Sequence, residues 1–312
     1  MKKPRIVVVG SSNTDMVVKT RHIPAVGETV TGGQFVMAAG GKGANQAVAA
    51  ARMGAEVTFV AKVGQDVFGD QAIEGYKKDG ILTDLILRDP ENATGVALIL
   101  VDEQGRNLIS VASGANHRLT PADVQRAADR IRAADCVMLQ LEIPMETVEC
   151  AAQIAVEAGV PVILDPAPAA PLSPGLLKHV AYLTPNESEA EQLTGLPVRD
   201  EATARAAAEK LLRQGPRHVI VTLGVKGALV ADGARMTLVP ARPVQAQDTT
   251  AAGDAFNGGL ASALGRGLSL DEAVRQASLV AALSVTRMGA QPSLPTEEEV
   301  RRFAEDDATR PA

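Results

Sequence analysis

Residues 136–164 read CVMLQLEIPMETVECAAQIAVEAGVPVIL, and this stretch carries the pattern on which the fold prediction rests. Two short apolar runs, 136–141 and 160–164, enclose an alanine-rich helical segment at 145–158. Continuous apolar strands separated by a helix are typical of a parallel sheet that helices cover on both faces. The stretch therefore predicts one strand–helix–strand unit of an α/β fold.

The same alternation continues through most of the chain. Further strands are predicted at 6–9, 57–60 and 219–223, and further helices at 44–53, 120–134 and 202–213. Two segments interrupt it: 28–36 reads as extended, and 94–111 reads as a hairpin around Asp-Glu-Gln-Gly at 102–105. We expect a single α/β domain over 1–312, a three-layer α/β/α structure whose central sheet is mostly parallel. Two insertions, about 15–36 and 94–113, are expected to form a small β-sheet lid.

Composition excludes several classes of protein. The 312 residues carry 31 Lys and Arg against 37 Asp and Glu, a net charge of −6, and only 2% are aromatic. A nucleic-acid binder would need a basic surface and stacking rings, so no nucleic-acid partner is expected. No apolar run approaches the ~18 residues of a membrane span, and the run at 6–9 is too short for a signal peptide. Cys136 and Cys150 lack metal or redox spacing, so we expect a cytoplasmic protein without a membrane partner.

Familiar phosphate-binding and hydrolase motifs are absent. Val36 stands where a P-loop around Lys42 would need its first glycine, and Gly43 follows the lysine instead of Ser or Thr. No G-x-G-x-x-G follows the first strand, which argues against a dinucleotide-dependent oxidoreductase. G-x-S-x-G and H-E-x-x-H are absent too.

Two unusual glycine-containing clusters remain. Residues 38–50, AAGGKGANQAVAA, open a helix, and a glycine-rich turn without a ligand is the simpler interpretation. Residues 247–264, QDTTAAGDAFNGGLASAL, could likewise be an ordinary capped helix. However, the second cluster gathers small residues and carboxylates at one helix start, where backbone N–H groups attract anions. A carboxylate at Asp254 beside such an anion site is electrostatically unfavourable unless it has a function. One such function is to accept the proton of an attacking hydroxyl.

These motifs resemble the ribokinase family of sugar and nucleoside kinases. The resemblance covers nearly the whole chain and rests on residues 10–15, 40–45, 139–142 (LQLE), 184–187 (TPNE), 222–224, 248–254 and 286–293. It implies a kinase that transfers the γ-phosphoryl group of ATP to the 5-hydroxyl of D-ribose. Positioning and electrostatics dominate such a transfer, so a weakly basic carboxylate suffices as the base.

The resemblance also implies a role for individual residues at the sugar. Asp254 would be the base, and the backbone at Ala251, Ala252 and Gly253 would stabilise the transferring group. The residues expected to hold the sugar are Asn13, Thr14, Asp15, Gly41, Lys42, Gly43, Ala44, Asn45, Glu142 and Asp254. Asn13 and Asp15 could instead be turn residues after the first strand. Glu142 is harder to explain without a ligand, because it directly follows an apolar strand.

Nucleotide and metal positions are implied in the same way. Expected ATP contacts are Asn186, Thr222, Leu223, Gly224, Val225, Lys226, Gly227, Gly253 and Ser278. Ser278 departs from the Asn or His common in relatives. Glu189, with Asn186, would lie near Mg²⁺, although the pair could simply be a capping box. A K⁺ activator is expected at Asp248, Thr250, Ser284, Arg287, Gly289 and Ser293, with Arg287 using its backbone carbonyl, whereas Asp248 could merely cap the helix.

Two alternatives for the function stay open from the sequence, and one expectation concerns assembly. The substrate could be deoxyribose, a ketohexose or a nucleoside, although few aromatics are available to stack a base. The chain could also be a sugar-binding sensor, which would not need Asp254. Finally, residues 95–101 are apolar on both alternating faces, whereas a lid needs one buried face. We therefore expect a homodimer formed through the lid strands.

Overall fold

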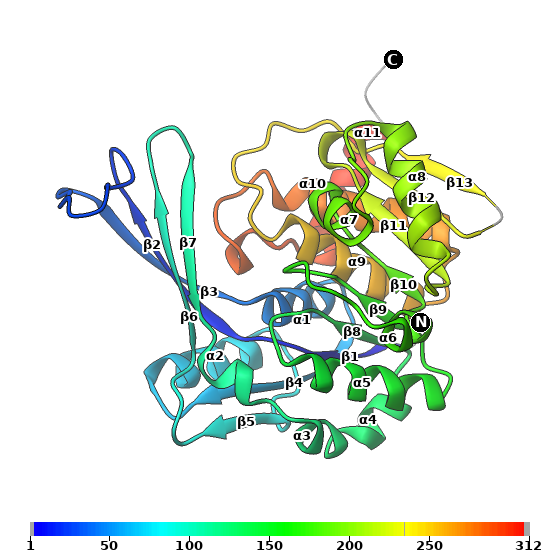
Figure 1. The fold of residues 1–312 in the computed structure, drawn as a ribbon, viewed down its shortest axis with the longest axis horizontal. Helices are drawn as coiled ribbons and strands as arrows, with labels where there is room; N and C mark the ends of the chain where they lie inside the picture. Colours follow the sequence, from blue (N-terminus) through cyan, green and yellow to red (C-terminus); the bar gives the residue numbers. More distant parts are fainter. Residues whose placement is uncertain (1–2, 234, 309–312) are drawn as a thin grey trace.

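In the computed structural model, which describes residues 3–233 and 235–308, a large twisted sheet runs through the body of the molecule (Figure 1). Residues 1–2, 234 and 309–312, which the domain prediction over 1–312 includes, lie outside this described part. Neighbouring strands from β11 to β5 pair in parallel, and β12 and β13 add antiparallel pairings. The strands in spatial order are β13 (Met236–Val239), β12 (Ala228–Ala231), β11 (His218–Thr222), β10 (Tyr182–Leu183), β9 (Val162–Leu164), β8 (Cys136–Leu139), β1 (Arg5–Val9), β4 (Glu56–Gly64) and β5 (Ile86–Asp89).

Helices cover both faces of this sheet, which confirms the three-layer prediction. Along β1, Val7 and Val9 pack into one apolar cluster, while Ile6 and Val8 pack into another on the opposite face. The first cluster contains residues of α3 (Pro121–Gln125), α4 (Ala128–Arg132), α5 (Met145–Glu157), α6 (Pro174–His179), α7 (Glu187–Thr194) and α8 (Glu201–Leu212). The second contains residues of α1 (Lys42–Arg52), α2 (Val67–Lys78), α9 (Ala252–Gly265), α10 (Leu270–Ser284) and α11 (Glu297–Ala308).

A second, four-stranded sheet stands away from the body (Figure 1). Its order is β3 (Gln34–Gly40), β2 (Asn13–Lys19), β6 (Gly95–Val101) and β7 (Asn107–Ala112). The predicted hairpin is confirmed: Asp102 accepts the backbone N–H groups of Gln104 and Arg106, and Gly105 adopts a positive φ of 76°. Of the extended segment predicted at 28–36, only residues 34–36 belong to a strand, β3, and residues 28–33 do not.

That segment becomes a strand only at Gln34, because two glycines turn the chain just before it. Gly32 has a φ of 86°, which disfavours a strand. A Cβ on Gly33 would stand 2.7 Å from the carbonyl oxygen of Lys19, so only glycine allows the close approach to β2 there.

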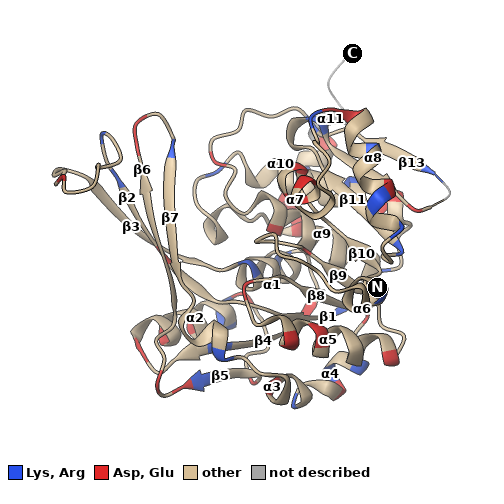
Figure 2. Ribbon diagram, in the orientation of Figure 1, with Lys and Arg blue, Asp and Glu red and all other residues tan. Residues whose placement is uncertain are grey.

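Most predicted elements of the body are present, with one clear correction. The predicted helix at 120–134 is two short helices, because Arg126 and Ala127 bond three residues back, to Asp123 and Val124, instead of four. Several helices missing from the prediction begin at a side-chain cap, such as Asp66 before α2 and Ser173 before α6. Acidic and basic residues occur together on the outer helices α8 and α11 (Figure 2), where Arg205 pairs with Glu201 and Arg301 pairs with Glu298. Among the described residues no helix has both the length and the apolar character to cross a membrane.

Candidate active site

The polar centre of the molecule forms where β1 and β8 end and α1 begins. Glu142, three residues beyond β8, accepts a hydrogen bond from Ser11 Oγ at 2.5 Å and one from the backbone N–H of Lys42 at 2.9 Å. The helix start favours a carboxylate because its first N–H groups lack partners within the helix. Glu142 thus ties the turn after β1 to the first residue of α1.

Glycine in the GGKG motif is required by close backbone packing. Gly41 precedes α1 with a φ of 90°, and a Cβ there would stand 2.8 Å from the backbone nitrogen of Asn13. A Cβ on Gly43 would stand 2.5 Å from the backbone nitrogen of Ser11. The helix start and the turn after β1 therefore touch along their backbones, which brings Lys42 and Asn45 to the carboxyl ends of the strands.

Asp254 lies in the first turn of α9, with its side chain buried in this centre. Asn45 Nδ2 donates to its Oδ2 at 2.9 Å, and Gln46 Nε2 donates to its Oδ1 at 3.1 Å. Burial raises the pKa of Asp254, and it outweighs the opposing effects of the Lys42 charge and of the two amides. A raised pKa makes a carboxylate a stronger base, as proton abstraction requires.

The helix start beside Asp254 leaves a donor for an anion. Ala251 precedes α9 in the left-handed region with a φ of 59°, the one non-glycine residue at positive φ in the described chain. The Ala252 N–H donates to the carbonyl of Thr249 at 3.2 Å. The exposed Gly253 N–H has no partner among the residues described. Of the predicted N–H pair, only Gly253 is therefore free.

A cavity of about 180 Å³ opens at this helix start. Burial lowers the pKa of Lys42, but the charges of Asp165, Asp254 and Glu142 outweigh burial and leave that pKa above its ordinary value. Lys42 and the free N–H of Gly253 therefore offer an anion a positive charge and a donor, in a cavity that the carboxyl groups of Asp165, Glu189 and Asp254 also line. Its lining residues are Lys42, Asp165, Thr184, Asn186, Glu189, Thr222, Thr249, Ala251, Ala252, Gly253, Asp254 and Asn257.

Asn13 and Asp15 belong to β2 and are not turn residues, so that alternative is wrong. They share one face of the strand, whereas Thr14 points to the opposite face. Burial, with added repulsion from Glu142 and Asp254, raises the pKa of Asp15 to about 6. Gly43, Ala44 and Asn45 are all buried in the first turn of α1.

The predicted nucleotide residues divide into two groups. Asn186, Thr222 and Gly253 line the cavity, and an isolated parallel bridge joins Asn186 to Thr222. Five others, Leu223, Gly224, Val225, Lys226 and Gly227, form the turn after β11, and Ser278 lies half-buried on α10, all outside the cavity lining. Val225 is 94% exposed, so an apolar surface is available on the turn that follows Thr222.

Asn186 and Glu189 do form the capping box that the sequence left open. The Asn186 side chain accepts the Glu189 N–H at 2.9 Å, and Glu189 Oε2 accepts the Asn186 N–H at 2.8 Å. Glu189 nevertheless lines the cavity. Within residues 3–233 and 235–308, no three His, Cys, Asp or Glu side chains are arranged to hold a metal ion.

The predicted K⁺ residues come from two segments that Asp248 joins. Its Oδ1 accepts from Thr250 Oγ1 at 2.6 Å, and its Oδ2 accepts the Gly289 N–H at 2.8 Å. Burial raises the pKa of Asp248, but these bonds outweigh it and keep the pKa low. Asp248 does not cap α9, since Ala251 is the capping position and has no side-chain bond, so the simpler interpretation is wrong.

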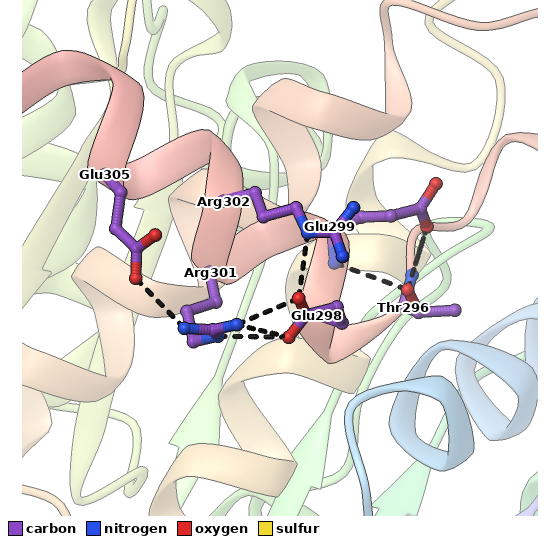
Figure 3. Close-up of polar contacts among 6 residues, drawn as sticks. All are labelled: Thr296, Glu298, Glu299, Arg301, Arg302 and Glu305. Atoms are coloured by element: carbon purple, nitrogen blue, oxygen red, sulfur yellow. Dashed lines mark hydrogen bonds and ion pairs between the residues drawn. The ribbon is translucent and has the colours of Figure 1, made fainter.

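The 284–293 segment is fixed at its other side by α11. Arg287 pairs with Glu299 at 2.7 Å, so its guanidinium is engaged by α11. Glu299 also accepts from Thr296 at the start of α11 (Figure 3), and the Arg287 bond lowers the pKa of Glu299 to about 2. Ser284 and Ser293 are fully buried, and their hydroxyls donate to backbone carbonyls three residues back.

Sequence reasoning missed three buried polar residues of this centre. Asp165 follows β9 directly, the same strand-end signal that identified Glu142, and could have been found. Gln46 lies inside the quoted 38–50 motif but was given no role. Asn116 donates to Asn13 Oδ1, and no local pattern marks it.

Comparisons with known proteins agree with this geometry. Residues 3–297 match the pfkB family of carbohydrate kinases. The chain is 45% identical to a ribokinase of Haemophilus influenzae, covering 96% of this chain and 98% of that protein. It is 40% identical to a deoxyribokinase of Salmonella typhi, with the same coverage. A structure of Arabidopsis thaliana ribokinase complexed with ribose and ATP superposes with a TM-score of 0.90 at 34% identity, covering 97% and 99% of the two chains.

Proposed function

Because the chain belongs to the pfkB family of carbohydrate kinases, we propose that it phosphorylates D-ribose with ATP, giving D-ribose 5-phosphate and ADP. The printed activities of its relatives, and the ribose and ATP in a solved relative, support this substrate pair. The bond formed joins the 5-oxygen of ribose to the γ-phosphorus, and the bond broken joins that phosphorus to the β–γ bridging oxygen.

The observation that carries the proposal is the adjacency of Asp254 to the free N–H of Gly253 at one helix start. The carboxylate accepts the proton of the attacking hydroxyl, and the N–H donates to the phosphoryl oxygens as charge develops on them. Lys42 adds a positive charge at the same cavity. Asn13, Asp15, Asn45 and Glu142 supply the acceptors and donors that sugar hydroxyls need.

Two ions belong to the proposal. Mg²⁺ would accompany the phosphates of ATP near Glu189, whose second carboxylate oxygen is outside the capping box, since Mg²⁺ usually binds one or two carboxylates, water and substrate phosphate. K⁺ would bind at Asp248 with the backbone carbonyls of the 284–293 segment. An ionised carboxylate and carbonyl oxygens form a hard donor set that suits such a cation.

The second sheet is proposed to act as a lid over the sugar and as a dimer interface. The 15–36 and 94–113 insertions supply its strands. Asp15 lies on the face of β2 that also carries Asn13, and this face is proposed to cover the sugar. The opposite face carries Met37, Leu98 and Leu108, all at least 44% exposed. A second copy of this chain would cover that face. We also propose a cytoplasmic location, for which the two free cysteines are suited.

The function is tested by measuring ADP release with D-ribose, 2-deoxy-D-ribose, D-fructose and adenosine. Ribose is expected to give the highest kcat/KM. Asp254→Asn should bind ribose about as tightly as the wild type but lower kcat by about 10²–10⁴-fold, because it removes the base alone. A variant that keeps more than half of the wild-type kcat would overturn the role of Asp254, and a wild type inactive on ribose would overturn the substrate.

Deoxyribose is the second candidate, favoured by the deoxyribokinase relative. The two sugars differ only in the 2-hydroxyl, so the ratio of their kcat/KM values decides between them. A site that hydrogen-bonds this hydroxyl rejects the sugar that lacks it, since its buried polar groups stay unpaired. A higher kcat/KM for 2-deoxyribose would replace the ribose assignment.

A further inference from the structure

Gln46 lies between two buried carboxylates and has no part in the chemistry described so far. Its side chain is 1% exposed, and its Nε2 donates to Asp165 Oδ2 at 2.8 Å and to Asp254 Oδ1 at 3.1 Å. One amide nitrogen carries two hydrogens, so each carboxylate receives one of them. Gln46 therefore uses its full donor capacity on the two acids.

The orientation of this amide is fixed by a third residue. Gln140, which is fully buried just beyond β8, donates from Nε2 to Gln46 Oε1 at 2.6 Å. In this arrangement the Gln46 nitrogen faces the two acids, and its oxygen faces the Nε2 of Gln140. Gln140 is itself closely packed: a Cβ on Gly10 would stand 2.1 Å from its Oε1.

Helical spacing places the donors on one side of α1. Lys42, Asn45 and Gln46 stand at positions i, i+3 and i+4 of the helix, which share a face. Asn45 binds Oδ2 of Asp254 and Gln46 binds Oδ1, so both oxygens of the carboxylate are held. Two bonds from one rigid helix fix the plane of this carboxylate, which a single bond would leave free to turn.

We propose that Gln46, held by Gln140, is a positioning residue that fixes the carboxylate of Asp254 in the orientation that accepts the proton of the sugar hydroxyl. The inference rests on the proposed kinase function. Loss of the Gln46 bond frees Oδ1, and the charge of Lys42, which acts on Asp254, then draws the carboxylate out of line. The other charged side chains that act on or surround Asp254 are Asp15, Glu142, Asp165 and Glu189.

The test is a kinetic cycle with Gln46→Met, Gln140→Met and the double variant, using the sugar that the wild type phosphorylates fastest. Methionine keeps the length of glutamine and removes its hydrogen-bonding atoms. Gln46→Met should lower kcat by about 10- to 100-fold, the range expected when a reacting group is misaligned, with both KM values within about threefold of wild type. Gln140→Met should lower kcat less than Gln46→Met does. Added to Gln46→Met, it should cause no further loss of kcat.

Thr147→Val is the matched control for loss of a buried hydrogen bond. Thr147 is fully buried on α5 and donates to the carbonyl of Leu119 at 2.7 Å, away from Asp254. It should lower the melting temperature without changing kcat. A merely structural role for Gln46 predicts the same behaviour, whereas a positioning role predicts loss of kcat in a variant that still binds sugar.

The outcomes separate the inference from the function on which it rests. A wild type that phosphorylates no sugar overturns both. An active wild type, an impaired Asp254→Asn and an unchanged Gln46→Met overturn the inference alone. Equal loss from Gln140→Met in both backgrounds also overturns it, because Gln140 would then act independently of Gln46. If Gln46→Met does not fold, Gln140→Met decides: a kcat within twofold of wild type contradicts the proposal.

Discussion

The side-chain amide of Asn116 donates to Oδ1 of Asn13 at 2.7 Å, and Asn116 Oδ1 accepts the backbone N–H of Ser12 at 2.9 Å. Asn116 lies in the short helix η1 (Gly114–Arg118), which follows β7 of the second sheet. The pair therefore joins the lid strands to the turn after β1. This bond turns Oδ1 of Asn13 toward Asn116, which leaves the NH₂ group on the other side of the amide to donate to a ligand.

Asn116→Asp tests this link. A carboxylate cannot donate to Asn13 Oδ1, so the amide of Asn13 loses its fixed orientation. We expect the KM for the sugar to rise by about tenfold, as for a lost hydrogen bond, with kcat changed less than threefold. Steady-state kinetics measures both constants, and Asn107→Asp on exposed β7 is the control. An unchanged KM would mean that Asn13 is oriented without Asn116.

Sugar affinity should depend on pH through Asp15, whose pKa is raised to about 6 by burial and by the neighbouring acids. The ionised carboxylate accepts hydroxyl hydrogens and the protonated form accepts them less well. Affinity should therefore be constant above about pH 7 and should fall as the pH drops through 6. Calorimetric titration with ribose from pH 5 to 8 measures it. Asp15→Asn, which does not titrate, should bind weakly with a flat profile, and a flat wild-type profile would contradict the assignment.

Replacing Na⁺ by K⁺ at constant ionic strength should raise kcat several-fold. In the proposed site the ion orders the segment from Asp248 to Gly253, and loss of one oriented N–H donor in other enzymes costs ~10²–10³-fold in kcat. Asp248→Ala should abolish the difference between the salts, whereas Asp129→Ala, at an exposed position on α4, should preserve it. Equal wild-type rates in the two salts would mean that the Asp248–Gly289 bond orders the segment unaided.

The exposed face of the second sheet should hold two copies of the chain together. Leu98→Lys places a charge at the centre of that face and should convert the dimer to a monomer in sedimentation at micromolar concentration. Val156→Lys, at an exposed apolar position on α5, should leave the dimer intact. A wild type that sediments as a monomer, with or without ribose, would exclude the proposed interface.

The sequence by itself determined the layers of the fold and the position of two site motifs. Apolar strands and helical periodicity are local properties, so the strand–helix–strand unit at 136–164 was predicted within a few residues. Glu142 was identified because it follows an apolar strand. Asp254 was identified because small residues and carboxylates gather with it at one helix start. Local signals were weaker where glycines turn the chain, and the strand expected from residue 28 begins only at Gln34.

Only the tertiary structure decided which polar groups meet. Gln46 lies 119 residues from Asp165 and 208 from Asp254, and Asn116 lies 103 residues from Asn13, so no spacing within a segment relates them. Their hydrogen bonds arise because β1, β8 and β9 end at one edge of the sheet while α1 and α9 begin there. A buried amide must satisfy whatever acceptors packing brings to it, and packing is a property of the whole chain.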